Sequence, residues 1–207
     1  MARRYEHSQE EIKAMVMQAA NQIIVEQGGA ALNVRKIAKN IGYTVGSIYM
    51  VFENMADLVL HVNAETLDEI AGVLNKVETG SASQDLEEIA KAYLMFAHLN
   101  FNRWSMLFGN RFVETGHFPD WYRAKMNRLE EIITTQIARL HPENNLQQNQ
   151  RIGNALWGGI HGVCLLSING MPDKKALEEA RETLLILVRT FVGGERVNGK
   201  RLAGNSE

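Results

Sequence analysis

The chain has 207 residues, a formal net charge of −2 at pH 7, 45% hydrophobic residues and 22% charged residues. This composition indicates a globular protein that can bury a sizeable core in one or two domains, and it contains no apolar run long enough to span a bilayer. The N-terminal segment lacks the apolar stretch of a secretory signal. Cys164 is the single cysteine, which excludes an internal disulfide, so we expect a cytoplasmic protein with no membrane partner.

The first predicted helix begins at Ser8, which forms a capping-box pattern with Glu11. Apolar residues then recur at helical spacing until two consecutive glycines at positions 28 and 29 end the helix. Arg3 and Arg4 precede it. They are either a basic arm that reaches a DNA minor groove or part of a frayed terminus.

The most informative pattern in the chain follows this helix. Asn33 can cap a helix that ends at Gly42, and Thr44 can cap a second short helix seeded by residues 45–49. Asn54 can cap a third helix. Two short helices joined by so tight a turn are typical of a helix-turn-helix, which presents its second helix to the major groove of DNA.

The charge pattern around this motif agrees with DNA binding. No acidic residue occurs between Gln27 and Phe52, whereas Arg35, Lys36 and Lys39 lie inside that window. In a mildly acidic chain, a local basic window indicates a small patch that contacts phosphates. The alternative is that the three cations form the solvated face of one helix.

These residues resemble the DNA-binding head of the TetR family of bacterial one-component regulators, over about residues 9–62. Two positions depart from the family pattern. Met55 stands where a lysine that contacts a phosphate is common, and Tyr43 stands where a small aliphatic residue is usual. The matching residues are Ile37, Ala38, Gly42, Thr44, Gly46, Ser47, Ile48, Tyr49, Phe52 and Leu58.

The resemblance implies a helix-turn-helix domain at residues 1–53, with the motif at about residues 33–52, and a homodimer on a palindromic double-stranded DNA operator. Amides at the two helix N-termini would hold phosphates, and the small residues at positions 45–47 would face the bases. The expected DNA-binding residues are Asn33, Val34, Arg35, Thr44, Val45, Gly46, Ser47 and Tyr49.

Residues 54–192 are predicted to form a helical ligand-binding and dimerisation domain, followed by a disordered, glycine-rich tail at residues 193–207. No strand-like alternation bounded by hairpin signals appears, so the predicted fold class is all-α with about nine helices. Helical patterns cover about residues 54–77, 84–102, 104–114, 119–140, 146–168 and 174–192. Pro119, Pro142 and Pro172 each lie at or beside a predicted boundary.

Aromatic residues gather between Tyr93 and Tyr122, with methionines among them. Such a cluster can line an adaptable apolar pocket, or it can be ordinary core. On the pocket interpretation we expect a small apolar or aromatic effector. The expected ligand-binding residues are Phe96, Trp104, Trp121, Met126, Trp157 and His161.

Trp157, His161 and Gly162 resemble the Trp-x-x-x-His-Gly signature of the WHG-type C-terminal domain found in part of the TetR family. His161 with Cys164 could supply two metal ligands, but a complete site needs more. A core histidine bonded to a neighbouring helix is therefore favoured, and no metal or other cofactor is expected.

The last two long helices carry apolar stripes that can form a four-helix bundle across a two-fold axis, although burial within the same chain is an alternative. In the final helix the stripe comprises Leu177, Ala180, Leu184, Leu187, Val188 and Phe191.

The sequence contains neither a glycine-rich phosphate loop nor a nucleophile elbow, so it does not predict an enzyme. We therefore expect a TetR-like transcriptional repressor that a small ligand releases from DNA. The alternative is a helical ligand-binding protein whose head docks a protein partner.

Overall fold

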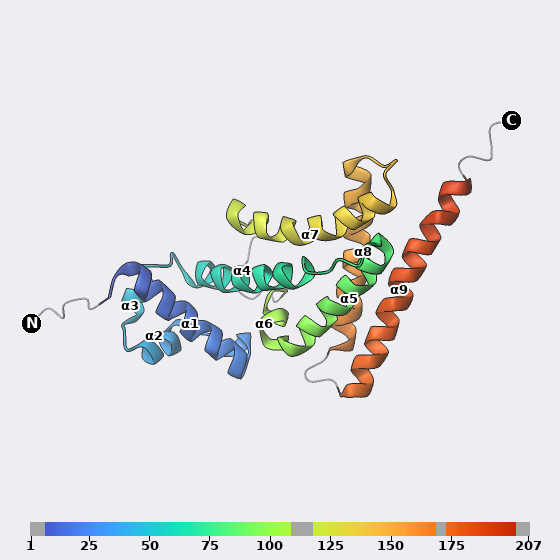
Figure 1. Cartoon of the computed structure of the whole chain (residues 1–207). Helices are drawn as coiled ribbons and strands as arrows, with labels where there is room; N and C mark the ends of the chain where they lie inside the picture. Colours follow the sequence, from blue (N-terminus) through green and yellow to red (C-terminus); the bar gives the residue numbers. More distant parts are fainter. Residues whose placement is uncertain (1–6, 109–117, 169–172, 202–207) are drawn as a thin grey trace, which may run out of the picture. The chain divides into compact units, whose positions relative to one another are not determined.

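The computed structural model of the chain describes residues 7–108, 118–168 and 173–201 (Figure 1). Within these ranges it contains nine α-helices, a short 3-10 helix and no strand, which confirms the all-α prediction. The elements are α1 (Gln9–Gln27), η1 (Gly29–Ala31), α2 (Val34–Ile41), α3 (Val45–Ile48), α4 (Met55–Leu74), α5 (Ala82–Leu99), α6 (Phe101–Met106), α7 (Asp120–Leu140), α8 (Leu146–Ser167) and α9 (Lys174–Arg201).

The chain divides into two compact units. The first contains residues 1–68 and 102–123, and the second contains residues 69–101 and 124–207. The boundary therefore lies inside α4, between Asp68 and Glu69, and most of α6 belongs to the same unit as α1, α2 and α3. The division at residues 53 and 54 predicted above concerns function, and it stays a prediction.

Local chemistry explains where the helices of the first unit begin and end. Ser8 and Glu11 form the expected capping box, in which each side chain accepts a hydrogen bond from the other residue's amide. The helix α1 ends at Gly28, which has φ +78°, and α2 ends at Gly42 with φ +73°. These left-handed conformations favour glycine. Below α2 and α3, buried Ile37, Ile48 and other apolar side chains join the face of α1 in one core.

In the second unit, α9 packs against both α5 and α8 (Figure 1). A Cβ atom added to Gly159 on α8 would lie 3.0 Å from Cδ2 of Leu187, so the glycine permits the close contact between α8 and α9. On α9, Ala180, Leu184 and Val188 are buried. The middle of the apolar stripe on α9 therefore lies in the core of its own chain, as the alternative interpretation of this stripe proposed.

Two helices differ most from their predicted bounds. The helix α6 covers residues 101–106 instead of 104–114, and residues 109–117 lie outside the described residues, as does Pro172. The helix α9 continues to Arg201, beyond the predicted end at residue 192. The glycine pair at residues 193 and 194 does not end the helix, because glycine within a helix is disfavoured by only about 1 kcal/mol relative to alanine.

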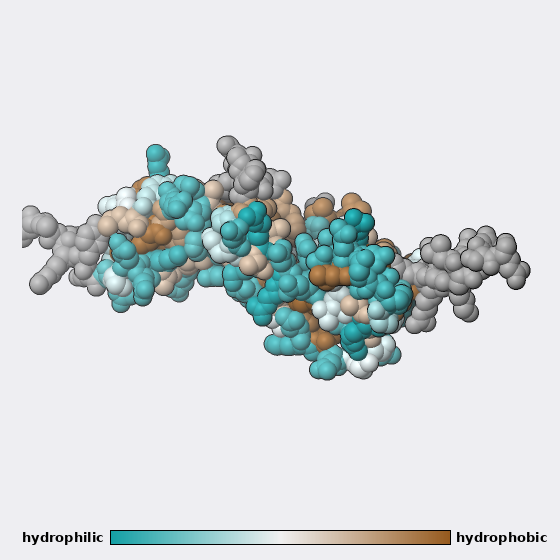
Figure 2. Space-filling model, turned by 90° about the horizontal axis from the view of Figure 1, so that it is seen from above, coloured by the Kyte–Doolittle hydropathy of each residue, from teal (hydrophilic) through white to brown (hydrophobic). Residues whose placement is uncertain are grey.

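The described helices include none that is both long and apolar enough to cross a membrane. On the face shown in Figure 2, hydrophobic residues form patches between hydrophilic ones.

Candidate nucleic-acid interface and ligand site

The turn between α2 and α3 is built from side-chain caps. The Asn33 side chain accepts a 2.9 Å hydrogen bond from the amide of Lys36 at the start of α2. Thr44 Oγ1 accepts a 3.1 Å bond from the amide of Ser47 at the start of α3. Each cap satisfies an amide that the helix itself leaves without a partner, so the two short helices have defined starting points.

The structure exposes five of the eight predicted DNA-binding residues. Ser47 is buried, and its hydroxyl lies 2.9 Å from that of Thr44. Ser47 therefore supports the turn and does not present its side chain to a partner. Val34 and Val45 are half-buried, and the exposed residues are Asn33, Arg35, Thr44, Gly46 and Tyr49.

Gly46 lies on the exposed side of α3. A Cβ atom added there would have one neighbour, Thr44 Oγ1, at an ordinary contact distance of 3.7 Å. Its φ is not positive, since the glycines with positive φ in the described chain are Gly28, Gly42 and Gly80. Neither space nor backbone conformation therefore requires glycine at this position.

The basic residues of α2 have different surroundings. Arg35 and Lys39 are exposed and have no ion-pair partner within the part of the chain that the structure describes. The ammonium group of Lys36 donates to the side chain of Gln27 at the end of α1. Arg35 and Lys39 are therefore the cations of α2 that are available to bind phosphates. Lys36 links α2 to α1 through its hydrogen bond to Gln27.

Two contacts near this surface involve residues that departed from the expected pattern. The Tyr43 hydroxyl lies 2.7 Å from Nδ1 of His7, and this bond fixes the start of the described chain beside the turn. Met55 is half-buried and packs against the core under α1, α2 and α3. His7 was not a predicted site residue, although the unusual Tyr43 was a signal that this turn has a partner.

The six expected ligand-binding residues are divided between the two units. Trp104, which is fully buried, and Trp121, which is 39% exposed, belong to the first unit. Phe96, Met126, Trp157 and His161 belong to the second. Each unit therefore contains only part of the expected ligand-binding set.

In the second unit the structure brings together Trp157, His161 and the buried Tyr93. The Tyr93 ring centroid lies 4.6 Å from that of Trp157, and its hydroxyl lies 2.9 Å from Nδ1 of His161. Burial lowers the pKa of His161, so the ring is held in its neutral form more strongly than in water. His161 is bonded to a neighbouring helix, as the core interpretation expected. Tyr93 was noted in the aromatic cluster but not selected as a site residue.

Cys164 is an unfavourable metal ligand in this position. It is fully buried, and burial raises the pKa of its thiol to about 12, whereas metals bind the thiolate. The described residues contain no group of three or more His, Cys, Asp or Glu side chains that could hold a metal ion.

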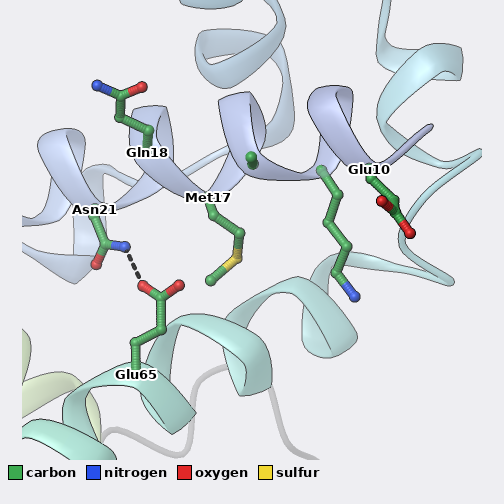
Figure 3. A pocket seen from close by; sticks show the side chains of 7 residues that line it. Glu10, Met17, Gln18, Asn21 and Glu65 are labelled. Atoms are coloured by element: carbon green, nitrogen blue, oxygen red, sulfur yellow. Dashed lines mark hydrogen bonds between the residues drawn. The ribbon is translucent and has the colours of Figure 1, made fainter. Parts of the chain in front are cut away.

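Two cavities of the described chain are lined by no aromatic residue. A groove of about 460 Å³ lies between α1 and α4 and is lined by residues that include Lys13, Asn21 and Glu65 (Figure 3). A second cavity of about 360 Å³ lies between α7 and α8 and is lined by residues that include Thr134 and Leu146. Neither is lined by an expected ligand-binding residue.

Comparison with known proteins agrees with this geometry. Residues 16–62 match the sequence profile of the family described as "Bacterial regulatory proteins, tetR family". Over 161 residues the chain is 26% identical to an uncharacterized HTH-type transcriptional regulator of Mycobacterium tuberculosis, which covers 76% of this chain and 71% of that protein.

Solved structures share the fold. A protein of unknown function from Rhodococcus sp. RHA1 has a TM-score of 0.71 and 15% identity, covering 94% of this chain and 98% of that one. The transcriptional regulator FadR from Bacillus subtilis, solved in complex with stearoyl-CoA, has a TM-score of 0.62 and 16% identity. That match covers 84% of this chain and 97% of that one. The family match ends at residue 62, so the resemblance to a WHG-type C-terminal domain stays a prediction.

Proposed function

We propose that this chain, a TetR-family DNA-binding transcriptional regulator, acts as a homodimeric repressor that a small apolar or aromatic ligand releases from a palindromic operator. In this proposal the head formed by α1, α2 and α3 binds duplex DNA, with α3 in the major groove.

The observation that carries the proposal is Gly46. Glycine within a helix costs about 0.5–1 kcal/mol relative to alanine, and a site with free space and ordinary backbone conformation gains nothing from it inside the fold. The same is true of Gly72 on α4, but Gly46 lies on the short helix after the tight turn, which is the helix that a helix-turn-helix presents to DNA. A missing side chain on the exposed face of α3 lets another molecule approach the helix backbone closely, as a DNA groove requires.

The surroundings of Gly46 suit a duplex. Thr44 and Tyr49 are exposed and carry hydroxyl groups that can donate to phosphates. Arg35 and Lys39 are exposed on α2, the helix before the turn, and can pair with the backbone of the same duplex. Val45 is the first residue of α3 and has an apolar side chain. Such a side chain can contact the methyl group of a thymine in the major groove.

An apolar effector is supported by the aromatic side chains of each unit. Trp157 is half-buried beside Tyr93, and Trp121 is partly exposed. The FadR relative was solved with stearoyl-CoA, which has a long apolar chain. Whatever its identity, an inducer must bind the DNA-released state more tightly than the DNA-bound state, since equal affinity shifts no equilibrium.

A homodimer through the last two long helices is supported by apolar side chains that remain exposed there. Leu165 and Leu166 on α8 are 54% and 86% exposed, and Ile186 on α9 is 67% exposed. These residues differ from the buried stripe of Leu184 and Val188. They supply an apolar surface that a second copy of the chain can cover.

The experiment that tests DNA binding compares two glycines. Gly46 on α3 and Gly72 on α4 are both exposed helical glycines with room for a side chain. Duplexes that bind the full chain are first selected from a random pool. Gly46→Gln and Gly72→Gln are then compared for unfolding free energy and for affinity to the selected duplex.

Both variants should fold with unchanged or slightly higher stability, because glutamine is the better helix former. Only Gly46→Gln should lose affinity, by about tenfold or more, which corresponds to about 1.4 kcal/mol. Wild-type affinity in Gly46→Gln, or failure to select any duplex, would contradict the proposal.

A further inference from the structure

The His61 side chain on α4 contacts residues from three other parts of the first unit, which are α1, the segment after α3, and α7. The ammonium group of Lys13 on α1 lies 3.0 Å from His61 Nε2, and the same group lies 5.3 Å from the centre of the Phe52 ring. The Phe52 ring is in edge contact with the imidazole, with 5.4 Å between ring centroids. The ring of Trp121 on α7 also packs against the imidazole, with 4.7 Å between ring centroids. His61 thus links α1, the first helix of the head, to α4, the helix that follows the helix-turn-helix.

The hydrogen-bond pattern determines the form of the imidazole. An ammonium group can only donate, so Nε2 of His61 must be the acceptor of the Lys13 bond. The proton of the neutral ring is then on Nδ1, which lies 3.0 Å from the main-chain oxygen of Asp57 and 3.3 Å from Oδ1 of its carboxylate. Both are acceptors, so every contact around the ring fits the neutral form with the proton on Nδ1.

Asp57 connects this arrangement to the beginning of α4. Its amide donates a 2.9 Å bond to the side chain of Asn54, and its carboxylate accepts a 3.0 Å bond from the amide of Glu53. Those residues directly follow the segment after α3. The state of His61 therefore bears on the connection between the helix-turn-helix and α4.

A second polar tie between α1 and α4 lies along the same groove (Figure 3). The Asn21 side chain donates a 2.7 Å hydrogen bond to the carboxylate of Glu65, four residues after His61. Neither of these two side chains is a histidine, so this hydrogen bond has no imidazole that could be protonated in the pH range where histidine titrates. The Asn21–Glu65 hydrogen bond therefore serves as the control for the hydrogen bond between Lys13 and His61.

We propose that His61 is a proton-sensitive positioning residue, whose neutral ring holds α1 on α4 through Lys13 and whose protonation opens this tie. The consequence for DNA rests on the proposed function, because it assumes that the head binds a duplex. Acidification then lowers the affinity of the head for DNA.

Protonation acts on the tie in two ways. It places a second hydrogen on Nε2, so the acceptor for Lys13 disappears, and it puts two positive charges where the two nitrogen atoms are now 3.0 Å apart. The Asp57 carboxylate lies 3.3 Å from Nδ1, which carries a proton in either state, so this contact is kept. Glu10 and Glu65 line the adjoining groove together with Lys13. Trp121 and Phe52 carry no charge.

The first experiment follows the imidazole itself in the full chain, without DNA. The His61 ring signals, assigned by their loss in His61→Gln, are recorded by nuclear magnetic resonance from about pH 5 to about pH 8. In Lys13→Met the ring nitrogen signals at about pH 8 should change, because Nε2 loses the donor that keeps the ring proton on Nδ1. Unchanged ring nitrogen signals would overturn the proposal whether or not the chain binds DNA.

The second experiment measures affinity for the selected duplex at about pH 8 and about pH 5.5, across the range in which histidine titrates. Wild type should lose severalfold more affinity on acidification than His61→Gln, whose amide can accept from Lys13 but cannot be protonated. Asn21→Ala removes the other tie and should keep the wild-type pH dependence. If His61→Gln and wild type lose the same affinity on acidification, the tie does not control the head.

The two experiments separate the proposals. Absence of DNA binding at every pH, together with His61 ring signals that depend on Lys13, would overturn the proposed function and leave the Lys13–His61 tie in place.

Discussion

The side-chain amide of Asn102 donates a 2.9 Å hydrogen bond to the main-chain oxygen of Val25, across 77 positions of the sequence. This bond joins α6 to the last turn of α1, where backbone oxygens have no partner within the helix. Met106, one turn further along α6, packs against Gly29 so closely that an added Cβ atom would lie 3.0 Å from its sulfur. A short helix from the middle of the chain therefore contacts the junction between α1 and α2.

Asn102→Ala should lower the unfolding free energy by about 1 kcal/mol, the usual net value of one hydrogen bond. The cost stays small because the bond is near the surface, and water can replace the amide at Val25. Urea unfolding measures it, with Asn127→Ala on the exposed face of α7 as the control that should change little. Equal stability of both variants and wild type would show that the contact contributes nothing.

Asp85 should give the second unit an acid-sensitive component of stability. Its carboxylate is buried and accepts bonds from the hydroxyl and amide of Thr79, at 2.7 and 2.6 Å, and from Arg139 at 2.6 Å. The Thr79 hydroxyl, then the Thr79 amide and Arg139, hold the pKa of Asp85 below its ordinary value against the opposing effect of burial. A lowered folded-state pKa stabilises the fold above the unfolded-state value, and this contribution disappears as pH falls through the folded-state value.

Asp85→Asn should therefore cost about 2 kcal/mol at neutral pH, and the difference from wild type should shrink below about pH 4. Chemical unfolding as a function of pH measures both effects. The control is Glu88→Gln, which removes an exposed pair with Lys91 and should stay within about 0.5 kcal/mol at every pH. A difference that grows on acidification would have the wrong sign for this account.

Tyr43→Phe removes the hydroxyl that binds His7 and tests whether this contact matters for DNA. Residues 1–6 lie outside the described residues, but Arg3 and Arg4 are only a few positions before His7. If Arg3 and Arg4 form the basic arm that the sequence suggests, Arg3→Ala and Arg4→Ala should weaken DNA binding more in wild type than in Tyr43→Phe. A double-mutant cycle on duplex affinity gives the coupling, and strictly additive effects would exclude it.

Met55→Lys should add the phosphate contact that this head lacks relative to the TetR pattern that it resembles. Because Met55 is half-buried, the aliphatic part of lysine can follow the methionine path while the ammonium group reaches solvent. The slope of log affinity against log salt should steepen by about 0.9, and binding should tighten for most sequences. Val73→Lys, at the far end of α4, should leave the slope unchanged. An unchanged slope in Met55→Lys would show that position 55 does not approach DNA.

Leu166→Asp and Ile186→Asp should give folded monomers, because each places a charge on an exposed apolar side chain that we propose a second copy covers. Leu184→Asp should instead unfold the chain, since Leu184 is fully buried within it. Sedimentation equilibrium and circular dichroism distinguish the two results. Val25→Asp in the head is the exposed control and should remain dimeric, whereas a dimer that survives Leu166→Asp and Ile186→Asp must use another interface.

The local parts of this fold were predictable from the sequence because their causes are local. Ser8, Asn33, Thr44 and Asn54 cap helices through hydrogen bonds to amides three residues later, so the pattern is contained in four positions. Gly42 has the positive φ that ends α2. Residue types at fixed short spacing therefore predicted the helix-turn-helix correctly.

The rest depended on pairings with no local signature. Lys13 and His61 are 48 positions apart, and nothing in either segment predicts that they meet. The orientation of Ser47 was not predictable because α3 has only four residues, too few for a periodic pattern to define a buried side. The membership of α6 in the first unit likewise follows from long-range packing against α1.

The burial of Cys164 has a practical consequence for spectroscopy. Its thiol is inaccessible and its pKa is raised to about 12, so maleimide and methanethiosulfonate reagents should leave the native chain unlabelled. The natural sequence is thus already a cysteine-silent background. A cysteine introduced at exposed Asn40 would carry the one spin label or fluorophore of each protomer. The spacing between two heads could then be measured directly, with and without an effector, while the native thiol is left in place.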